Sequence, residues 1–306
     1  MPKMNVSKSI TVNASQQKVK DFLADFHNWK NWSPWLICEP EATINYADDG
    51  KYYKWEGSRV GSGEMQVIDE SQHRIDYDLT FLKPWKSKAK VAFNFKEEGN
   101  QTIVNWTMDS SLPFFMFWMK KAMEIYIGMD YDRGLKMLKE ELEQGKINSE
   151  LEFVGSTNYE GCNYIGIKTT TPFSSIGEAM QKDFSALHDF INKNNIEVTG
   201  LPFSEYQKFN LVKDKVVYVS GFPVSSEPSN LPESFFYGSL PKMKMNTVRH
   251  KGTYDHLGNA WTAVMMMERN KEFKKNKKAS PLEIYQNDPG TTAPEDLVTD
   301  ISMPIL

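Results

Sequence analysis

The second half of the chain contains an internal repeat, and this feature restricts the fold more than any other. The segment that begins at Pro202 aligns with the segment that begins at Pro281, so that Tyr206 falls on Tyr285. Ahead of each segment lies an apolar pattern with helical spacing, and ahead of each helical pattern lies a strand-like stretch. Each copy therefore predicts the order strand, helix, strand, strand. Two such units pair most simply into one α+β domain with a pseudo-twofold axis and a cleft between the copies.

A polar stretch separates this repeat from the rest of the chain. Gly145 is a plausible helix end, and the residues after it are polar until apolar alternation resumes. Tryptophan is concentrated before this stretch, and only Trp261 follows it, which indicates two different cores. We therefore predict two domains, residues 1–147 and 151–306.

Glu283 stands between Leu282 and Ile284 in a predicted strand of the second copy. Side chains of a strand alternate between its two faces, so Glu283 and Tyr285 share one face. Either that face is solvated and Glu283 is an ordinary surface residue, or the face lines a cavity in which the carboxylate selects a ligand. The sequence alone leaves both interpretations open.

Residues 151–306 resemble the GyrI-like, AraC-type effector-binding domain. The resemblance rests on the E-x-Y-x-x-D-P motif, an acidic loop, a terminal I-x-x-P-I strand and a preceding G-T-Y segment: Glu283, Tyr285, Asp288, Pro289, Glu295, Asp296, Ile301, Pro304, Ile305, Gly252, Thr253 and Tyr254. It implies a pocket for amphipathic, often cationic aromatic compounds, whose positive charge meets the glutamate. Many members of the family carry a helix-turn-helix DNA reader; this chain shows no such segment, so we expect no direct DNA binding.

Aromatic residues near the motif are candidates for the wall of this pocket. They are Tyr285, Tyr206, Tyr254 and Trp261. Flat aromatic rings attract organic cations, but the same residues are common in protein cores, so each has a structural interpretation beside the functional one.

The first domain has a looser resemblance to a known fold. A strand, a helix, an aromatic turn, several alternating strands and a long helix at 115–144 follow one another. This order is similar to the helix-grip fold of the START-like or SRPBCC superfamily, polyketide cyclase/dehydrase type, and covers residues 1–147. The resemblance implies an antiparallel sheet that wraps the C-terminal helix around a cavity for a hydrophobic molecule. Helical spacing then predicts the inward face of the helix, opposite Trp106 and Phe93 on the sheet: Trp118, Ala122, Ile125 and Met129.

The segment LPFFMFWMKK, residues 112–121, has two interpretations. Its aromatic residues could touch a membrane surface, with Lys120 and Lys121 near the lipid headgroups. The start of a cavity-lining helix also has to be apolar, and we favour this second interpretation.

Composition excludes several classes of function. The net charge of −4 argues against nucleic acid as the main partner. The two cysteines, Cys38 and Cys162, are far apart, and the histidines lack metal-binding spacing, so we expect no metal and no cofactor. No apolar run reaches the roughly 20 residues of a membrane span, and we expect a cytoplasmic protein.

Two classes of function stay open. We favour a non-catalytic protein that senses, sequesters or carries hydrophobic or amphipathic, cationic aromatic molecules in a pocket built around Glu283. The alternative is a hydrolase that detoxifies small reactive electrophiles, with Glu283 as general base and a tyrosine such as Tyr285 as hydrogen-bond donor. A homodimer is compatible with either.

Overall fold

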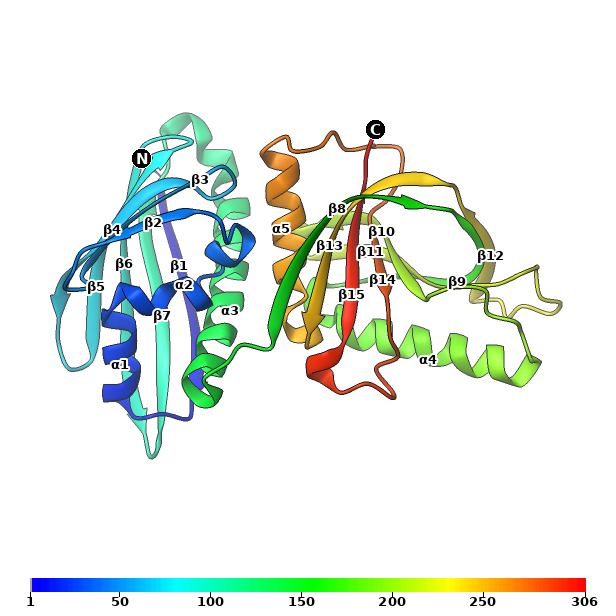
Figure 1. The fold of residues 1–306 in the computed structure, drawn as a ribbon, viewed down its shortest axis with the longest axis horizontal. Coiled ribbons are helices and arrows are strands. Elements are labelled where there is room, and N and C mark those ends of the chain that lie inside the picture. The colour runs from blue at the N-terminus through cyan, green and yellow to red at the C-terminus, as the bar shows by residue number, and fades with distance from the viewer. Residues whose placement is uncertain (1) are drawn as a thin grey trace. The chain divides into compact units, whose positions relative to one another are not determined.

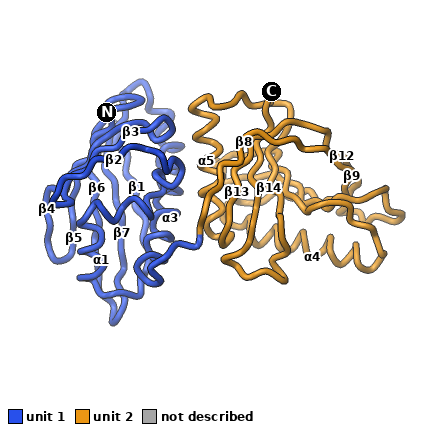
Figure 2. The backbone as a smooth tube through the Cα atoms, viewed as in Figure 1, with its two compact units in different colours: residues 1–148 blue, residues 149–306 orange. Residues whose placement is uncertain are grey.

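A computed structural model describes residues 2–306 of the chain. The chain divides into two compact units, residues 1–148 and 149–306 (Figure 2), and each unit is described by itself. Each consists of one antiparallel sheet with helices (Figure 1). The predicted α+β fold class is therefore confirmed.

Unit 1 contains a seven-stranded sheet in the order β1-β7-β6-β5-β4-β3-β2. The strands are β1 (Lys3–Val12), β2 (Thr43–Tyr46), β3 (Tyr52–Gly57), β4 (Gly61–Glu70), β5 (Arg74–Lys83), β6 (Ser87–Glu98) and β7 (Gln101–Ser111). After β1 the chain forms α1 (Gln16–Ala24) and α2 (Trp29–Trp32), and after β7 it forms the 3₁₀ segment η3 (Phe114–Met119) and the long helix α3 (Lys120–Gln144). This is the order of elements that the sequence predicts.

Aromatic rings fill the space where α3 meets the sheet. Trp106 of β7 stacks on Tyr131 of α3 with ring centroids 3.8 Å apart, and its other neighbours include Phe93 of β6 at 5.0 Å. Gly134 permits this close approach, because a Cβ there would lie 2.9 Å from the Trp106 ring. Rings stacked at this distance leave no room for a ligand between them.

The inward face of α3 differs from the predicted one. Trp118 is 70% exposed, so its placement on that face was wrong. The residues of α3 that belong to the core of unit 1 are instead Tyr131, Leu135, Met137, Leu138 and Leu142, with Met123 and Ile127 packed against it. The cause is local: Trp118 lies in η3, and a 3₁₀ segment turns more tightly than an α-helix, so α-helical spacing counted from Trp118 gives the wrong phase.

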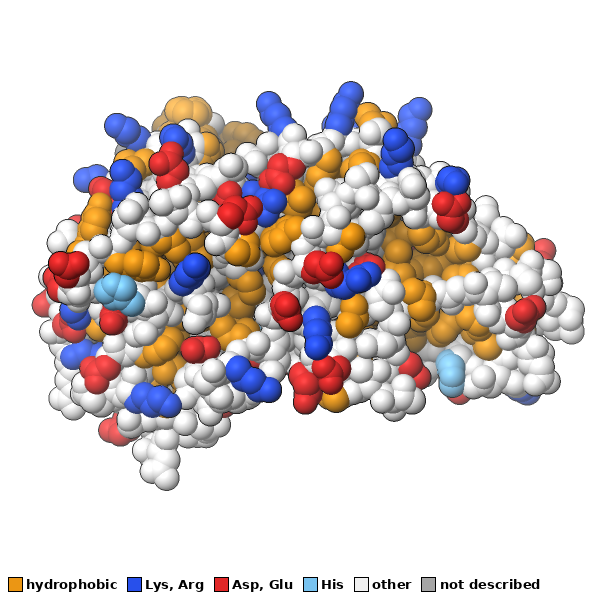
Figure 3. Space-filling model, viewed as in Figure 1, with side chains coloured by type: hydrophobic (Ala, Val, Ile, Leu, Met, Phe, Trp, Pro, Cys, Tyr) orange, Lys and Arg blue, Asp and Glu red, His pale blue; other side chains and the backbone are white. Residues whose placement is uncertain are grey.

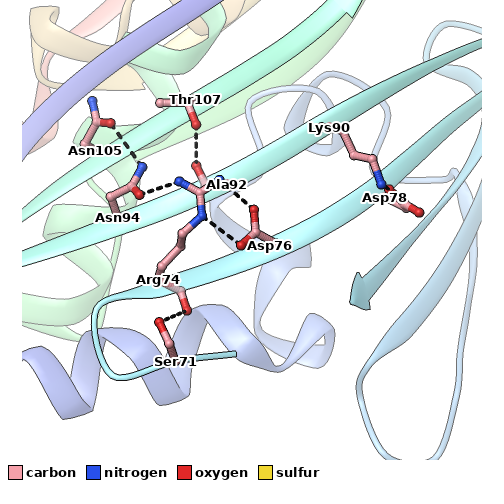
Figure 4. Close-up of polar contacts among 9 residues, drawn as sticks. All are labelled: Ser71, Arg74, Asp76, Asp78, Lys90, Ala92, Asn94, Asn105 and Thr107. Carbon is pink, nitrogen blue, oxygen red and sulfur yellow. Dashed lines mark hydrogen bonds and ion pairs between the residues drawn. The ribbon is translucent and has the colours of Figure 1, made fainter. Parts of the chain in front are cut away.

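The opposite face of the same sheet carries polar pairs across neighbouring strands (Figure 4). Arg74 of β5 donates to Asp76 and to Asn94 of β6, and Asn94 donates to Asn105 of β7. Lys90 pairs with Asp78 on the adjoining strands. This face is therefore suited to water, while the other face holds the core.

Unit 2 contains an eight-stranded sheet in the order β12-β9-β11-β10-β14-β15-β13-β8. Its strands are β8 (Ser149–Tyr159), β9 (Cys162–Thr171), β10 (Phe203–Asn210), β11 (Lys215–Pro223), β12 (Phe235–Leu240), β13 (Met243–Gly252), β14 (Leu282–Tyr285) and β15 (Val298–Pro304), and its helices are α4 (Ile176–Asn194) and α5 (Gly258–Arg269). The order is symmetric about the pair β10 and β14. The first predicted copy is β9-α4-β10-β11 and the second is β13-α5-β14-β15.

The two copies also exchange a strand, which the sequence did not predict. β8 precedes the first copy but pairs with β13 of the second, and β12 precedes the second copy but pairs with β9 of the first. Each copy thus has one strand more than the predicted strand, helix, strand, strand. The exchange ties the copies into one sheet.

Candidate functional site

The site lies at the centre of the unit 2 sheet, where the two copies meet. β10 and β14 pair antiparallel, and their register places Ser204 opposite Glu283. On β14, Leu282 packs in one apolar cluster with Phe203, while Glu283 bonds to side chains on the other face of the sheet. That second face is also covered by Met180 of α4 and Trp261 of α5. The predicted alternation of faces at Glu283 is confirmed.

Glu283 is buried, with 3% of its surface exposed. Its Oε1 accepts a hydrogen bond from the Tyr206 hydroxyl at 2.8 Å and another from the Trp261 indole N–H. Its Oε2 accepts a hydrogen bond from the Tyr285 hydroxyl at 2.8 Å. Glu283 is thus not a solvated strand residue; neutral donors from both copies and from α5 hold its two oxygens.

The environment of Glu283 opposes a negative charge. Burial raises the pKa of the Glu283 carboxyl above its usual value, and the hydrogen bonds from Trp261, Tyr206 and Tyr285 counteract part of this rise. Burial, together with the charge of Glu283, raises the pKa values of Tyr206 and Tyr285 well above normal, so both hydroxyls stay protonated and act as donors. Within residues 2–306, Glu283 forms no ion pair with a basic side chain.

Aromatic rings surround the carboxylate and lead from the interior toward solvent. The Tyr206 ring meets the Trp261 ring edge-on at 4.8 Å, and the Tyr285 ring meets the Tyr254 ring at 6.0 Å. Tyr206 is buried, Tyr285 and Trp261 are half-buried, and Tyr254 is 40% exposed. Flat apolar surface therefore extends from the buried carboxylate to the surface of the unit.

The structure brings five of the predicted site residues together: Glu283, Tyr285, Tyr206, Trp261 and Tyr254. The other two, Trp106 and Trp118, belong to unit 1, where Trp106 lies in the core and Trp118 is exposed. We name the first group the Glu283 cage.

Sequence reasoning missed several members of this environment. The Ser204 hydroxyl lies 3.0 Å from the Tyr285 hydroxyl, and the Phe184 ring lies 5.4 Å from the Tyr285 ring. A second buried acid, Asp183 of α4, accepts hydrogen bonds from Tyr218 and Thr169. Phe184 falls on the apolar stripe of the predicted first helix, which could have identified it; Asp183 gave no such signal.

The geometry suits recognition of positive charge. When it is ionised, a buried carboxylate held by neutral donors carries an uncompensated negative charge, which costs free energy that a cation at the same place would recover. Tryptophan and tyrosine faces attract cations as well. No group of side chains in residues 2–306 has the composition of a metal site, and within the same residues no helix is long and apolar enough to cross a bilayer.

Comparison with protein families gave two matches. Residues 3–143 match the family "Polyketide cyclase / dehydrase and lipid transport", and residues 158–306 match the "GyrI-like small molecule binding domain". The two matches fall in unit 1 and unit 2 respectively. No curated protein matched the chain.

Three solved structures with similar folds illustrate the likeness. The EcmrR C-terminal domain is 18% identical, with a TM-score of 0.40, covering 52% of this chain and 98% of that one. The protein SAV2435 bound to tetraphenylphosphonium is 18% identical, with a TM-score of 0.40, covering 51% and 94%. A START superfamily protein from Mycobacterium smegmatis is 19% identical, with a TM-score of 0.34, covering 46% and 99%.

Proposed function

From this two-domain architecture, START-like in residues 3–143 and GyrI-like in residues 158–306, we propose that the protein binds lipophilic aromatic cations in the Glu283 cage. Binding serves to sense, sequester or carry these molecules. Small-molecule binding itself follows from the family of the second domain; the cationic character of the ligand is our proposal.

The buried carboxylate carries the proposal. Glu283 has three neutral donors and no cationic partner among the described residues. A soft organic cation recovers the electrostatic cost without the strong hydration of a lysine or a metal ion. The ring edges and faces of Tyr206, Trp261 and Tyr285 supply the apolar surface that such a cation requires.

The hydrolase alternative makes a different demand on Glu283. In the hydrolase, Glu283 would act as a general base toward water, and its raised pKa would suit that role. We favour the binding role because the three donors that hold Glu283 are tyrosines and a tryptophan, whose rings also attract cations.

For unit 1 we propose no ligand between α3 and the sheet, because aromatic rings such as Trp106 and Tyr131 pack against each other there. The cytoplasmic location and the homodimer stay predictions from the sequence.

Calorimetry with two ions of equal shape tests the cation proposal. Tetraphenylphosphonium and tetraphenylborate have nearly the same size and apolar surface but opposite charges. We expect the protein to bind the phosphonium and to bind the borate at least tenfold more weakly, a difference of about 1.4 kcal/mol. Equal affinities, or a preference for the borate, would refute the proposal.

A further inference from the structure

Four large aromatic side chains lie exposed on consecutive turns of unit 1. In η3, Phe114 is 77% exposed, Phe115 75%, Phe117 61% and Trp118 70%. Their exposure removes the explanation favoured from the sequence, in which this segment lines an interior cavity. A folded protein rarely leaves so much contiguous apolar surface in water unless the surface binds something. We name these residues, together with Trp85, the aromatic end.

The fold gathers the aromatic end from two segments that leave the sheet at the same place. β6 and β7 pair from Ala89 and Ser110 onward, so the β5–β6 turn and the segment after β7 both extend beyond that end of the sheet. The turn carries Trp85, which is 47% exposed. The segment after β7 is anchored by the hydrogen bond from the Leu112 N–H to the carbonyl oxygen of Pro2, and η3 follows directly.

Lysines accompany the aromatic residues on both segments. Lys86 and Lys88 lie in or beside the β5–β6 turn, and Lys121 lies in the first turn of α3; all three are exposed and none forms an ion pair within residues 2–306. Lys83 and Lys120 are also present, paired with Glu56 at 2.8 Å and Glu124 at 3.7 Å. Figure 3 shows hydrophobic side chains at this end of unit 1 with basic side chains beside them.

The outer face of the unit 1 sheet has a different pattern. The outer face of the sheet carries cross-strand polar pairs such as Arg74 with Asp76 (Figure 4). Positive and negative side chains alternate there, as is usual for a solvated face. At the aromatic end, Lys86, Lys88 and Lys121 lie on the same two segments as the exposed rings and form no ion pair within residues 2–306.

Charge decides which partner fits this surface. A symmetric pair of this chain would place the same patch on both sides of the interface, so that the Lys86, Lys88 and Lys121 groups of two copies would face one another and repel. An anionic bilayer attracts these lysines, and its interfacial region is the environment in which tryptophan and phenylalanine rings insert. We propose that the aromatic end docks unit 1 onto anionic membrane surfaces.

Vesicle flotation of the full-length chain tests this docking. Vesicles of phosphatidylcholine mixed with phosphatidylglycerol should carry the wild-type protein upward in a gradient, and vesicles of phosphatidylcholine alone should carry much less. The variant Phe114→Ser/Phe115→Ser/Trp118→Ser should lower the partition coefficient at least tenfold. Lys86→Gln should lower it about fivefold and added salt should mimic that loss, since one basic residue near such a surface contributes about that factor.

Controls separate docking from unfolding. Ile68→Ser changes another exposed apolar side chain of unit 1, 47% exposed on β4, and should float like the wild type. Should the triple variant not fold, quenching of tryptophan fluorescence by brominated phosphatidylglycerol gives a second measurement, which Trp118→Phe should reduce. No flotation of the wild type, or equal flotation of the triple variant, would overturn the proposal. The proposal would also be overturned if the wild type formed a dimer, the triple variant were monomeric, and the wild type did not bind vesicles.

Discussion

Replacing Glu283 by glutamine isolates the role of charge in the cage. The amide has the volume of the carboxylate, and its oxygen can still accept from Tyr206 and Trp261, as Oε1 does. The amide nitrogen would occupy the place of Oε2 and donate to the Tyr285 oxygen, while the Tyr285 hydroxyl can turn to Ser204, 3.0 Å away. We therefore expect Glu283→Gln to fold normally and to lose only the negative charge.

The size of the effect follows from that loss. Two opposite charges about 6–10 Å apart attract each other by about 1.5–3 kcal/mol at an effective dielectric constant of about 20, so tetraphenylphosphonium should bind about 10- to 150-fold more weakly to Glu283→Gln. Tetraphenylborate should bind the variant no more weakly than the wild type, because a repulsive charge is gone. In the wild type, cation affinity should also fall as acidification protonates Glu283, at a pH above 4.5 because its pKa is raised; the variant should lack this pH dependence.

Calorimetry on three proteins provides the measurement. The matched control is Glu205→Gln, which makes the same change on β10. Glu205 pairs with Leu282, and its neighbour Ser204 pairs with Glu283. Glu205 lies on the other face of the sheet, so this control should bind both ions like the wild type. Equal losses for both ions in Glu283→Gln, or equal losses in the two variants, would refute the argument. Turnover of an electrophile that disappears in Glu283→Gln without loss of affinity would favour the hydrolase.

Three further predictions concern stability. Tyr206→Phe removes a donor to Glu283 and should lower the free energy of unfolding by about 1.5–3 kcal/mol at neutral pH. This loss should be smaller in acid, where Glu283 is protonated, and denaturant titrations at both pH values measure it. Gly134→Ala should destabilise unit 1 in chemical unfolding, because overpacking against Trp106 costs about 1–3 kcal/mol and outweighs the gain in helix propensity of about 1 kcal/mol. Burial lowers the pKa of His250 from 6.5 to about 4, so the unfolded chain binds the proton more readily and stability should fall as pH drops from about 6.5 toward 4. At about 1.4 kcal/mol per pKa unit the loss approaches roughly 3 kcal/mol, and it should be absent in His250→Gln; an unchanged pH profile in that variant would contradict this account.

Element order and strand faces could be predicted for physical reasons that act locally. Alternation along β14 placed Glu283 and Tyr285 on one face because successive strand residues must point to opposite sides. Local periodicity failed at η3, where the backbone is a 3₁₀ segment and not an α-helix. Counting from Trp118 gave α3 the wrong phase, and Trp118, which was predicted on the inward face, lies outside.

By itself, the sequence determined the pseudo-twofold α+β organisation of unit 2, because two stretches with the same pattern must fold alike. It also determined that Glu283 would share a face with Tyr285. Only the tertiary structure decided what surrounds that carboxylate. Tyr206 is 77 residues away in the chain, and it reaches Glu283 because β10 and β14 pair in one particular register. The tertiary structure also decided the exchange of β8 and β12 between the copies, because a strand can pair only with a sheet edge that no other strand occupies.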